Sequence, residues 1–157
     1  MDRRAFLTII LATGAGGIAA PVLFGSPAFA GKQEIFTGLK PGVAVAGYDP
    51  VAYFTQNMPV MGKASIALNH GGAQWHFSST ANRDAFKADP GKYVPQFGGY
   101  CAYAVSQGYT AKGEPEVWKI VDGKLYLNFS RGVQKTWQRD IPGYIVSAKA
   151  NWPSVLK

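Results

Sequence analysis

The chain has a single cysteine, Cys101, and this residue is the strongest candidate for chemistry in its 157 residues. Gly98 and Gly99 precede it, so the backbone there can adopt conformations closed to other residues or let another group approach closely. Tyr100 and Tyr103 place an aromatic ring on either side of the sulfur. One cysteine cannot form an internal disulfide, so it is a free thiol, a metal ligand or half of an intermolecular bridge. A cysteine that only packs as a small apolar side chain is the structural alternative.

The sequence has two histidines, and His76 is the expected companion of Cys101. A thiolate together with an imidazole favours soft or borderline metals, namely Cu(I), Cu(II) or Zn(II). Structural zinc normally has four ligands, and Cu(I) tolerates two or three, so we expect copper. His76 could instead act as a base that lowers the pKa of Cys101, or simply be hydrogen-bonded on a covered strand. We expect His70 to face solvent, and Met58 and Met61 either to pack or to offer thioether sulfur to copper.

A polar-aromatic cluster is expected around Tyr48, Asp49 and Tyr53. One interpretation is that Asp49 caps a helix and the two tyrosines pack in the core. The functional interpretation is that Asp49 orients His76, as carboxylates often orient ligating imidazoles. Tyr48 and Tyr53 would then support the site, and Tyr100 and Tyr103 would form the wall of the pocket.

Several common chemistries are not supported by the sequence. It has no Gly-rich phosphate loop after a strand, no Gly-x-Ser-x-Gly elbow and no His-Glu-x-x-His. The 9 acidic residues are too spread for a convincing carboxylate pair. The formal net charge is +7, but the basic residues form no arm, which argues against nucleic acid as a partner. Solubility, or loose attraction to anionic envelope surfaces, accounts for the charge.

Residues 1–30 are predicted to be a signal peptide that is cleaved after Ala30. Arg3 and Arg4 precede a weakly apolar run, and Ala28-Phe29-Ala30 has the small-x-small pattern of a cleavage site. The paired arginines resemble the twin-arginine export motif, with an ordinary Sec signal as the alternative. We therefore expect a periplasmic protein with one domain, residues 31–157, and no stable membrane insertion after cleavage. A twin-arginine route would allow a metal to be loaded before export.

The expected fold is a small single α+β domain of antiparallel hairpins with short helices and two C-terminal helices. Asp122-Gly123, between two alternating runs, predicts a hairpin with a type I′ turn. Residues 65–70 and 74–78 predict a second hairpin, whose three-residue turn would place His76 opposite Leu68. Residues 43–46 are expected to form a buried strand. Helices are expected at 50–54, at 81–88 after Ser79 or Thr80, at 131–139 after Ser130, and from Asp140 to about residue 151. No internal repeat is evident.

Six segments in order resemble the exported YHS-domain proteins, and they extend over nearly all of residues 31–157. They are Gly47-Tyr48-Asp49-Pro50-Val51-Ala52-Tyr53-Phe54, Trp75-His76-Phe77-Ser78-Ser79, Asn82-Arg83-Asp84-x-Phe86, Pro90-x-x-Tyr93-x-Pro95, Gly98-Gly99-Tyr100-Cys101-Ala102 and Trp118-x-Ile120-x-Asp122-Gly123-Lys124-Leu125-Tyr126-Leu127-Asn128. Trp75 stands where the motif that names the family has tyrosine.

The resemblance implies a small metal-binding module, because YHS domains are similar to cysteine-containing modules attached to heavy-metal transporters and reductases. Some relatives carry selenocysteine at the position that matches Cys101, which implies a thiolate that ligates a soft metal or performs redox chemistry. We therefore expect a periplasmic protein that binds a soft metal ion through Cys101 and His76, with copper as the expected metal. The alternatives are a thiol-based oxidoreductase, with Cys101 as nucleophile, His76 as base and a small thiol or peroxide as substrate, and a non-catalytic interaction module.

Overall fold

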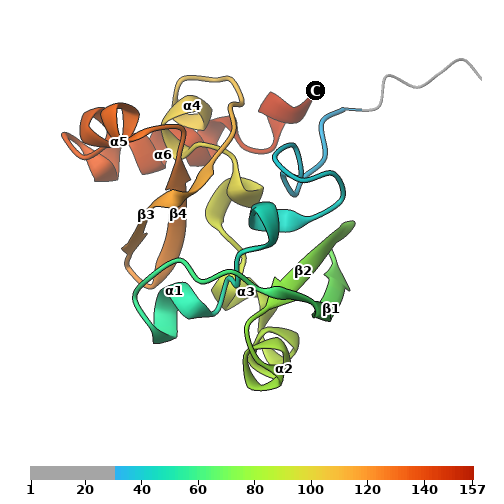
Figure 1. Cartoon of the computed structure of the whole chain (residues 1–157). Coiled ribbons are helices and arrows are strands. Elements are labelled where there is room, and N and C mark those ends of the chain that lie inside the picture. The colour runs from blue at the N-terminus through green and yellow to red at the C-terminus, as the bar shows by residue number, and fades with distance from the viewer. Residues whose placement is uncertain (1–30) are drawn as a thin grey trace, which may run out of the picture.

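The computed structural model describes residues 31–157 as an α+β fold, with short helices around two separate two-stranded antiparallel sheets. The expected fold class is confirmed, including the helices at the C-terminal end (Figure 1). The predicted signal peptide, residues 1–30, lies outside the described residues. None of the helices described is long and apolar enough to cross a membrane.

The first half of the fold runs as a turn, a short helix, a hairpin and a helix. Its elements are the 3-10 helix η1 (Ala44–Gly47), α1 (Ala52–Thr55), β1 (Lys63–His70), β2 (Ala73–Phe77) and α2 (Thr80–Ala88). The Ser79 hydroxyl oxygen accepts a hydrogen bond from the Asn82 backbone N–H at 3.1 Å. This bond satisfies one of the free N–H groups at the start of α2, so Ser79 is the cap that fixes where the helix begins.

The second half repeats this order of elements and then adds a C-terminal helix. After the single turn α3 (Pro90–Tyr93) come η2 (Gln96–Gly99), α4 (Ala102–Ser106), β3 (Glu114–Val121), β4 (Lys124–Asn128), α5 (Arg131–Trp137), α6 (Ile141–Asn151) and η3 (Ser154–Leu156). Asp122 and Gly123 have φ values of 50° and 71°, as a type I′ turn requires. The predicted β3–β4 hairpin is therefore confirmed.

The core consists of two clusters, one for each half. Trp75, Phe77 and Phe86 pack between the first hairpin and α2, with the rings of Trp75 and Phe86 5.0 Å apart. Tyr126 and Trp137 pack beneath the C-terminal helices, with their rings 5.5 Å apart. Successive residues of a strand point to opposite faces, so β4 contributes to both clusters and holds the halves together.

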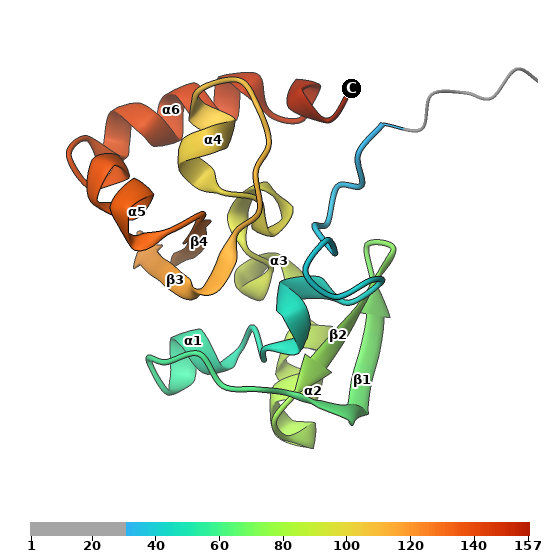
Figure 2. The same cartoon turned by 45° about the horizontal axis from the view of Figure 1, so that its top comes forward.

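The two halves share one backbone plan, which overturns the expectation of no internal repeat. In the first hairpin Lys63 pairs with Phe77, a bulge follows, and pairing resumes up to a two-residue turn. In the second hairpin Glu114 pairs with Asn128, and the bulge, the resumed register and the turn follow at the same spacings. Figure 2 shows the two hairpins apart from each other, β3–β4 at the left and β1–β2 at the lower right, each leading into its own helix, α5 or α2.

The segments before the hairpins also match. In each of the turns η1 and η2, the two middle residues have left-handed backbone. These residues are Val45 and Ala46 in η1, and Phe97 and Gly98 in η2. After these turns the backbone N–H groups of Asp49 and Cys101 donate to the carbonyls of Val60 and Ala111, at 2.8 and 2.9 Å. The thiol therefore occupies, in the second half, the position that Asp49 occupies in the first.

Two local predictions are wrong for reasons of turn geometry. Residues 43–46 do not form a strand, because Val45 and Ala46 have φ values of 50° and 52° and belong to the left-handed turn of η1. The β1–β2 turn has two residues, both glycines with positive φ, rather than three. This difference moves the register by one residue, so His76 lies opposite Ala67 and not Leu68.

Candidate functional site

Cys101 lies at the junction between η2 and α4, next to the strand β4. It is 1% exposed and is a free thiol. Its backbone N–H donates to Ala111, and a parallel bridge joins it to Leu127 on β4. These contacts fix the sulfur between the start of a helix and the end of a hairpin, on backbone that belongs to three different segments.

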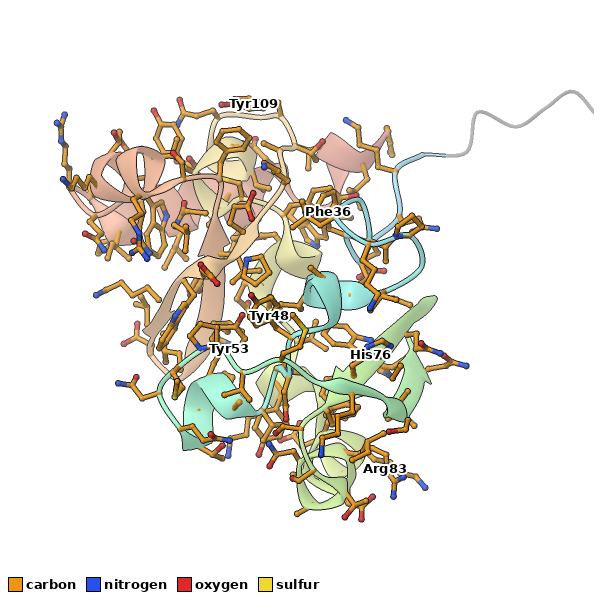
Figure 3. All side chains as sticks on the ribbon, in the orientation of Figure 1. Phe36, Tyr48, Tyr53, His76, Arg83 and Tyr109 are labelled. Atoms are coloured by element: carbon orange, nitrogen blue, oxygen red, sulfur yellow. The ribbon has the colours of Figure 1, made fainter. Side chains whose placement is uncertain are left out.

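An apolar pocket of about 320 Å³ opens beside Cys101. Its lining residues come from α4, the loop before β3, and the start of α5: Cys101, Tyr103, Ala104, Tyr109, Ala111, Phe129 and Val133. Tyr109 is half exposed and lies at the top of the molecule in Figure 3. The pocket therefore connects solvent to the only sulfur that can act as a nucleophile, through a wall that carries almost no charge.

Asn128 is the polar side chain that faces the thiol. The Sγ of Cys101 donates to the Oδ1 of Asn128 at 3.7 Å, and Asn128 is completely buried. Within the described part of the chain, the Nδ2 group of Asn128 has no hydrogen-bond partner. A buried unpaired amide costs stability, so its retention beside the sulfur needs an explanation. No sequence pattern singled out this residue, because it stands at the end of a motif dominated by apolar side chains.

Burial raises the pKa of the Cys101 thiol above its ordinary value. The nearby backbone N–H groups of Ala104, Phe129 and Tyr103 oppose this rise in the pKa. At neutral pH the resting group is therefore a thiol. Burial disfavours its anion, and the N–H groups favour the same anion.

His76 lies elsewhere, on β2, and is 3% exposed. One ring nitrogen, Nε2, is 2.8 Å from the Oε1 of Gln74, and the other faces Gly47. Burial, followed by the nearby charge of Lys40, lowers the pKa of His76 below its ordinary value. Figure 3 shows His76 beside the first hairpin, away from Tyr109 and the thiol pocket. The structure does not bring His76 to Cys101, so the expectation of one shared pocket is corrected.

Asp49 is completely buried and does not contact His76. Its Oδ1 accepts from the Val51 backbone N–H at 2.9 Å. Its Oδ2 accepts from the Ser78 backbone N–H at 2.7 Å, the Ser78 hydroxyl at 2.6 Å and the Asn82 side-chain amide at 2.7 Å. We call these donors the Asp49 cradle. Asp49 therefore ties η1 and α1 to the end of β2, which is the capping interpretation and not the orientation of an imidazole.

The three tyrosines expected to support the site are separated from the thiol pocket. The hydroxyl of Tyr48 donates to Glu116 at 3.1 Å and that of Tyr53 donates to the carbonyl of Pro115 at 2.8 Å. The hydroxyl of Tyr100 donates to the carbonyl of Gln33 at 2.8 Å. Each of these bonds joins segments distant in sequence, so these residues hold the fold together. Tyr103 does line the pocket, as expected.

Three features bear on the expectation of a metal. Among residues 31–157, no group of three or more histidine, cysteine, aspartate or glutamate side chains is placed to hold an ion. Met58 and Met61 are more than half exposed and lie outside the thiol pocket. The thiol pocket itself offers one sulfur and otherwise apolar or aromatic side chains. The residues that line the thiol pocket do not by themselves supply the four ligands of a closed structural zinc site.

The sequence resemblance to the exported YHS-domain proteins remains an expectation. Comparison with protein-family models, with characterised proteins and with solved structures gives no match to this chain.

Proposed function

We propose that the protein is a thiol-based oxidoreductase in which Cys101 reduces a small hydroperoxide bearing an apolar substituent. The observation that carries the proposal is the combination of a single thiol, a pocket that opens beside it and nearby backbone N–H groups that lower the pKa of the thiol. A thiolate is the nucleophilic form of cysteine, so groups that stabilise its anion promote attack. The apolar wall selects against charged substrates and admits a hydrocarbon substituent.

The first step is a two-electron oxidation of sulfur. The Cys101 thiolate attacks the terminal oxygen of the hydroperoxide, a sulfur–oxygen bond forms, and the oxygen–oxygen bond breaks. The leaving alkoxide takes up the proton released by the thiol, so the products are a sulfenic acid and an alcohol. Sulfur is oxidised and the peroxide is reduced, with no other reactant needed.

Recovery of the thiol requires a second reductant, because the chain has no other cysteine. A small-molecule thiol attacks the sulfenic acid, releasing water and forming a mixed disulfide with Cys101. A second small thiol then attacks this disulfide, which frees Cys101 and leaves the reductant as its own disulfide. The open rim at Tyr109 gives the route by which such a reductant reaches the sulfur.

The test is to add cumene hydroperoxide or hydrogen peroxide to the purified chain and to trap sulfenic acid with dimedone. We expect one adduct, on Cys101, that forms faster with cumene hydroperoxide than with hydrogen peroxide. Cys101→Ser should give no adduct. Val133→Phe, which narrows the pocket without touching the sulfur, should lower the ratio of the two rates. The absence of an adduct with both peroxides would refute the proposal.

Metal analysis of the same preparations separates this proposal from copper binding. Stoichiometric copper that is lost in Cys101→Ser, together with no sulfenic acid, would replace the redox proposal with the metal-binding one. His76→Ala is the matched variant, since His76 is outside the thiol pocket. The redox proposal requires that His76→Ala leave the rate of dimedone labelling within about twofold of that of the unsubstituted chain. If His76 were a catalytic base, this rate would fall further, and if it were a metal ligand shared with Cys101, the bound copper would be lost.

A further inference from the structure

The repeated backbone allows the surroundings of Cys101 to be compared with those of Asp49, the residue at the equivalent position in the first half. Asp49 and Cys101 both follow a left-handed turn, and both donate their backbone N–H to the carbonyl of a residue three positions before the hairpin, Val60 or Ala111. In the first half this position is occupied by a buried carboxylate, a full negative charge. Equivalent backbone therefore places a sulfur where its counterpart has an anion.

Two of the backbone N–H groups that favour the Cys101 anion stand at positions that correspond to donors of Asp49. The Val51 N–H, two residues after Asp49, donates to its carboxylate, and the Tyr103 N–H, two residues after Cys101, lowers the pKa of the thiol. The Ser78 N–H, just before the cap of α2, also donates to Asp49. The Phe129 N–H precedes the cap of α5 in the same way and also lowers the pKa of Cys101. Two backbone donors of the Asp49 cradle are thus repeated near the thiol.

The Asp49 cradle also includes a side-chain amide, and an amide is present beside Cys101 as well. Asn82 supplies its Nδ2 group to Asp49 from the first turn of α2. The counterpart of Asn82 in the second half is Val133, which lines the pocket and carries no donor. Asn128 places an amide next to the thiol from a different position, at the end of β4, with its Nδ2 group unpaired among the described residues.

We infer that the Cys101 site is an anion cradle, repeated from that of Asp49, which stabilises the thiolate and the sulfenate of Cys101, and that Asn128 positions the sulfur in both charge states. In the resting thiol the S–H donates to the Oδ1 of Asn128. When sulfur becomes anionic, the amide turns about its terminal bond and its free Nδ2 donates instead, since an anion can only accept. The identity of the anion, a thiolate or a sulfenate, rests on the proposed function. The existence of the cradle does not depend on that function.

The cradle can be tested without any oxidation. Cys101→Asp and Cys101→Asn place an anion and its neutral analogue at the same position. Because the backbone donors need an acceptor, we expect the aspartate variant to have the higher urea midpoint at pH 7. A carboxylate held by donors has a pKa below its unfolded value of about 3.9, so the advantage is full above that value and disappears as the pH falls through the folded pKa. An asparagine variant as stable as the aspartate variant at pH 7 would overturn the inference.

The role of Asn128 is tested by Asn128→Leu, which keeps the volume close and removes both polar atoms. We expect iodoacetamide alkylation of Cys101 to require a pH about one unit higher, and dimedone trapping after cumene hydroperoxide to slow about tenfold at pH 7, the effect of losing one hydrogen bond to a charged group. Stability in urea should not fall, because the unpaired amide is removed. Trp137→Phe is the control, since its indole N–H is also buried and unpaired in the described residues but lies outside the pocket lining.

The outcomes separate the two claims. An unchanged alkylation profile in Asn128→Leu, or the same change in Trp137→Phe, would refute the positioning role. A stable Cys101→Asp variant in a chain that forms no sulfenic acid would keep the anion cradle and reject the hydroperoxide reaction. A chain that forms sulfenic acid but tolerates Cys101→Asn better than Cys101→Asp would keep the reaction and reject the cradle.

Discussion

Replacing Asp49 by asparagine should destabilise the protein by about 3–5 kcal/mol, the cost of removing one partner from a buried charged network. Oδ2 accepts three hydrogen bonds and Oδ1 one, all between 2.6 and 2.9 Å, and the residue is completely buried. The side-chain amide of asparagine could still accept hydrogen bonds from one set of donors through its oxygen. Its NH₂ group would then face another N–H group, from which it cannot accept a hydrogen bond. The remaining bonds also lose the assistance of the negative charge.

Urea unfolding at pH 7 measures this cost, and a double-mutant cycle with Asn82→Ala identifies its source. Because the amide of Asn82 donates to Asp49 at 2.7 Å, the two substitutions should be non-additive by about 0.5–3 kcal/mol. The titration of His76 should not change in Asp49→Asn, since the two side chains do not touch. A loss below about 1 kcal/mol, or additive effects, would show that the carboxylate is not the anchor that its hydrogen bonds indicate.

Three further changes test other parts of the structure. His76 should titrate below 6.5 in an NMR pH series, because burial and then the charge of Lys40 disfavour the imidazolium. Its contribution to stability is therefore lost as the pH falls from 6.5 through the folded pKa. A midpoint at or above 6.5 would contradict this placement. The urea midpoint should decline as the pH rises above 9.0, because the raised pKa of folded Cys101 means that the thiol ionises more readily in the unfolded chain. Cys101→Ala should not show this decline. Gly98→Ala should abolish folding at 25 °C, as followed by circular dichroism, since the φ of Gly98 is 63° and an added Cβ would clash with the backbone oxygen of Glu34. Gly72→Ala is the control, because Gly72 has a similar φ of 76° but open space around it, and it should cost only about 1–2 kcal/mol of stability. Equal effects of the two substitutions would refute the steric argument.

The helix caps and the second hairpin could be predicted from the sequence because they depend on local chemistry. Ser79, Ser130 and Asp140 accept hydrogen bonds from N–H groups three residues later, as their types and positions indicated. Asp122-Gly123 forms the predicted turn because both residues tolerate positive φ. In each case the relevant contacts lie within a few residues, so the local pattern was sufficient.

The internal repeat escaped prediction because few of its residues are identical. The two halves retain matching turn glycines, such as Gly47 and Gly99, and matching caps, such as Ser79 and Ser130. The core positions keep only their bulk, as where Phe86 corresponds to Trp137. Backbone register is preserved by hydrogen bonds and by packing volume, and neither requires the same side chains. Comparison of residue types therefore could not detect it.

The sequence by itself determined that the chain has one sulfur nucleophile, where its helix caps and the turn of its second hairpin fall, and that its fold is of the α+β class. Only the tertiary structure decided which groups surround that sulfur. Asn128 and the N–H of Phe129 reach Cys101 because β3 and β4 return the chain to the start of α4, whereas His76 remains on a different sheet. Contacts between distant segments depend on strand register and on the packing of two hydrophobic clusters, and a one-residue error in a turn is enough to move a side chain to the other face.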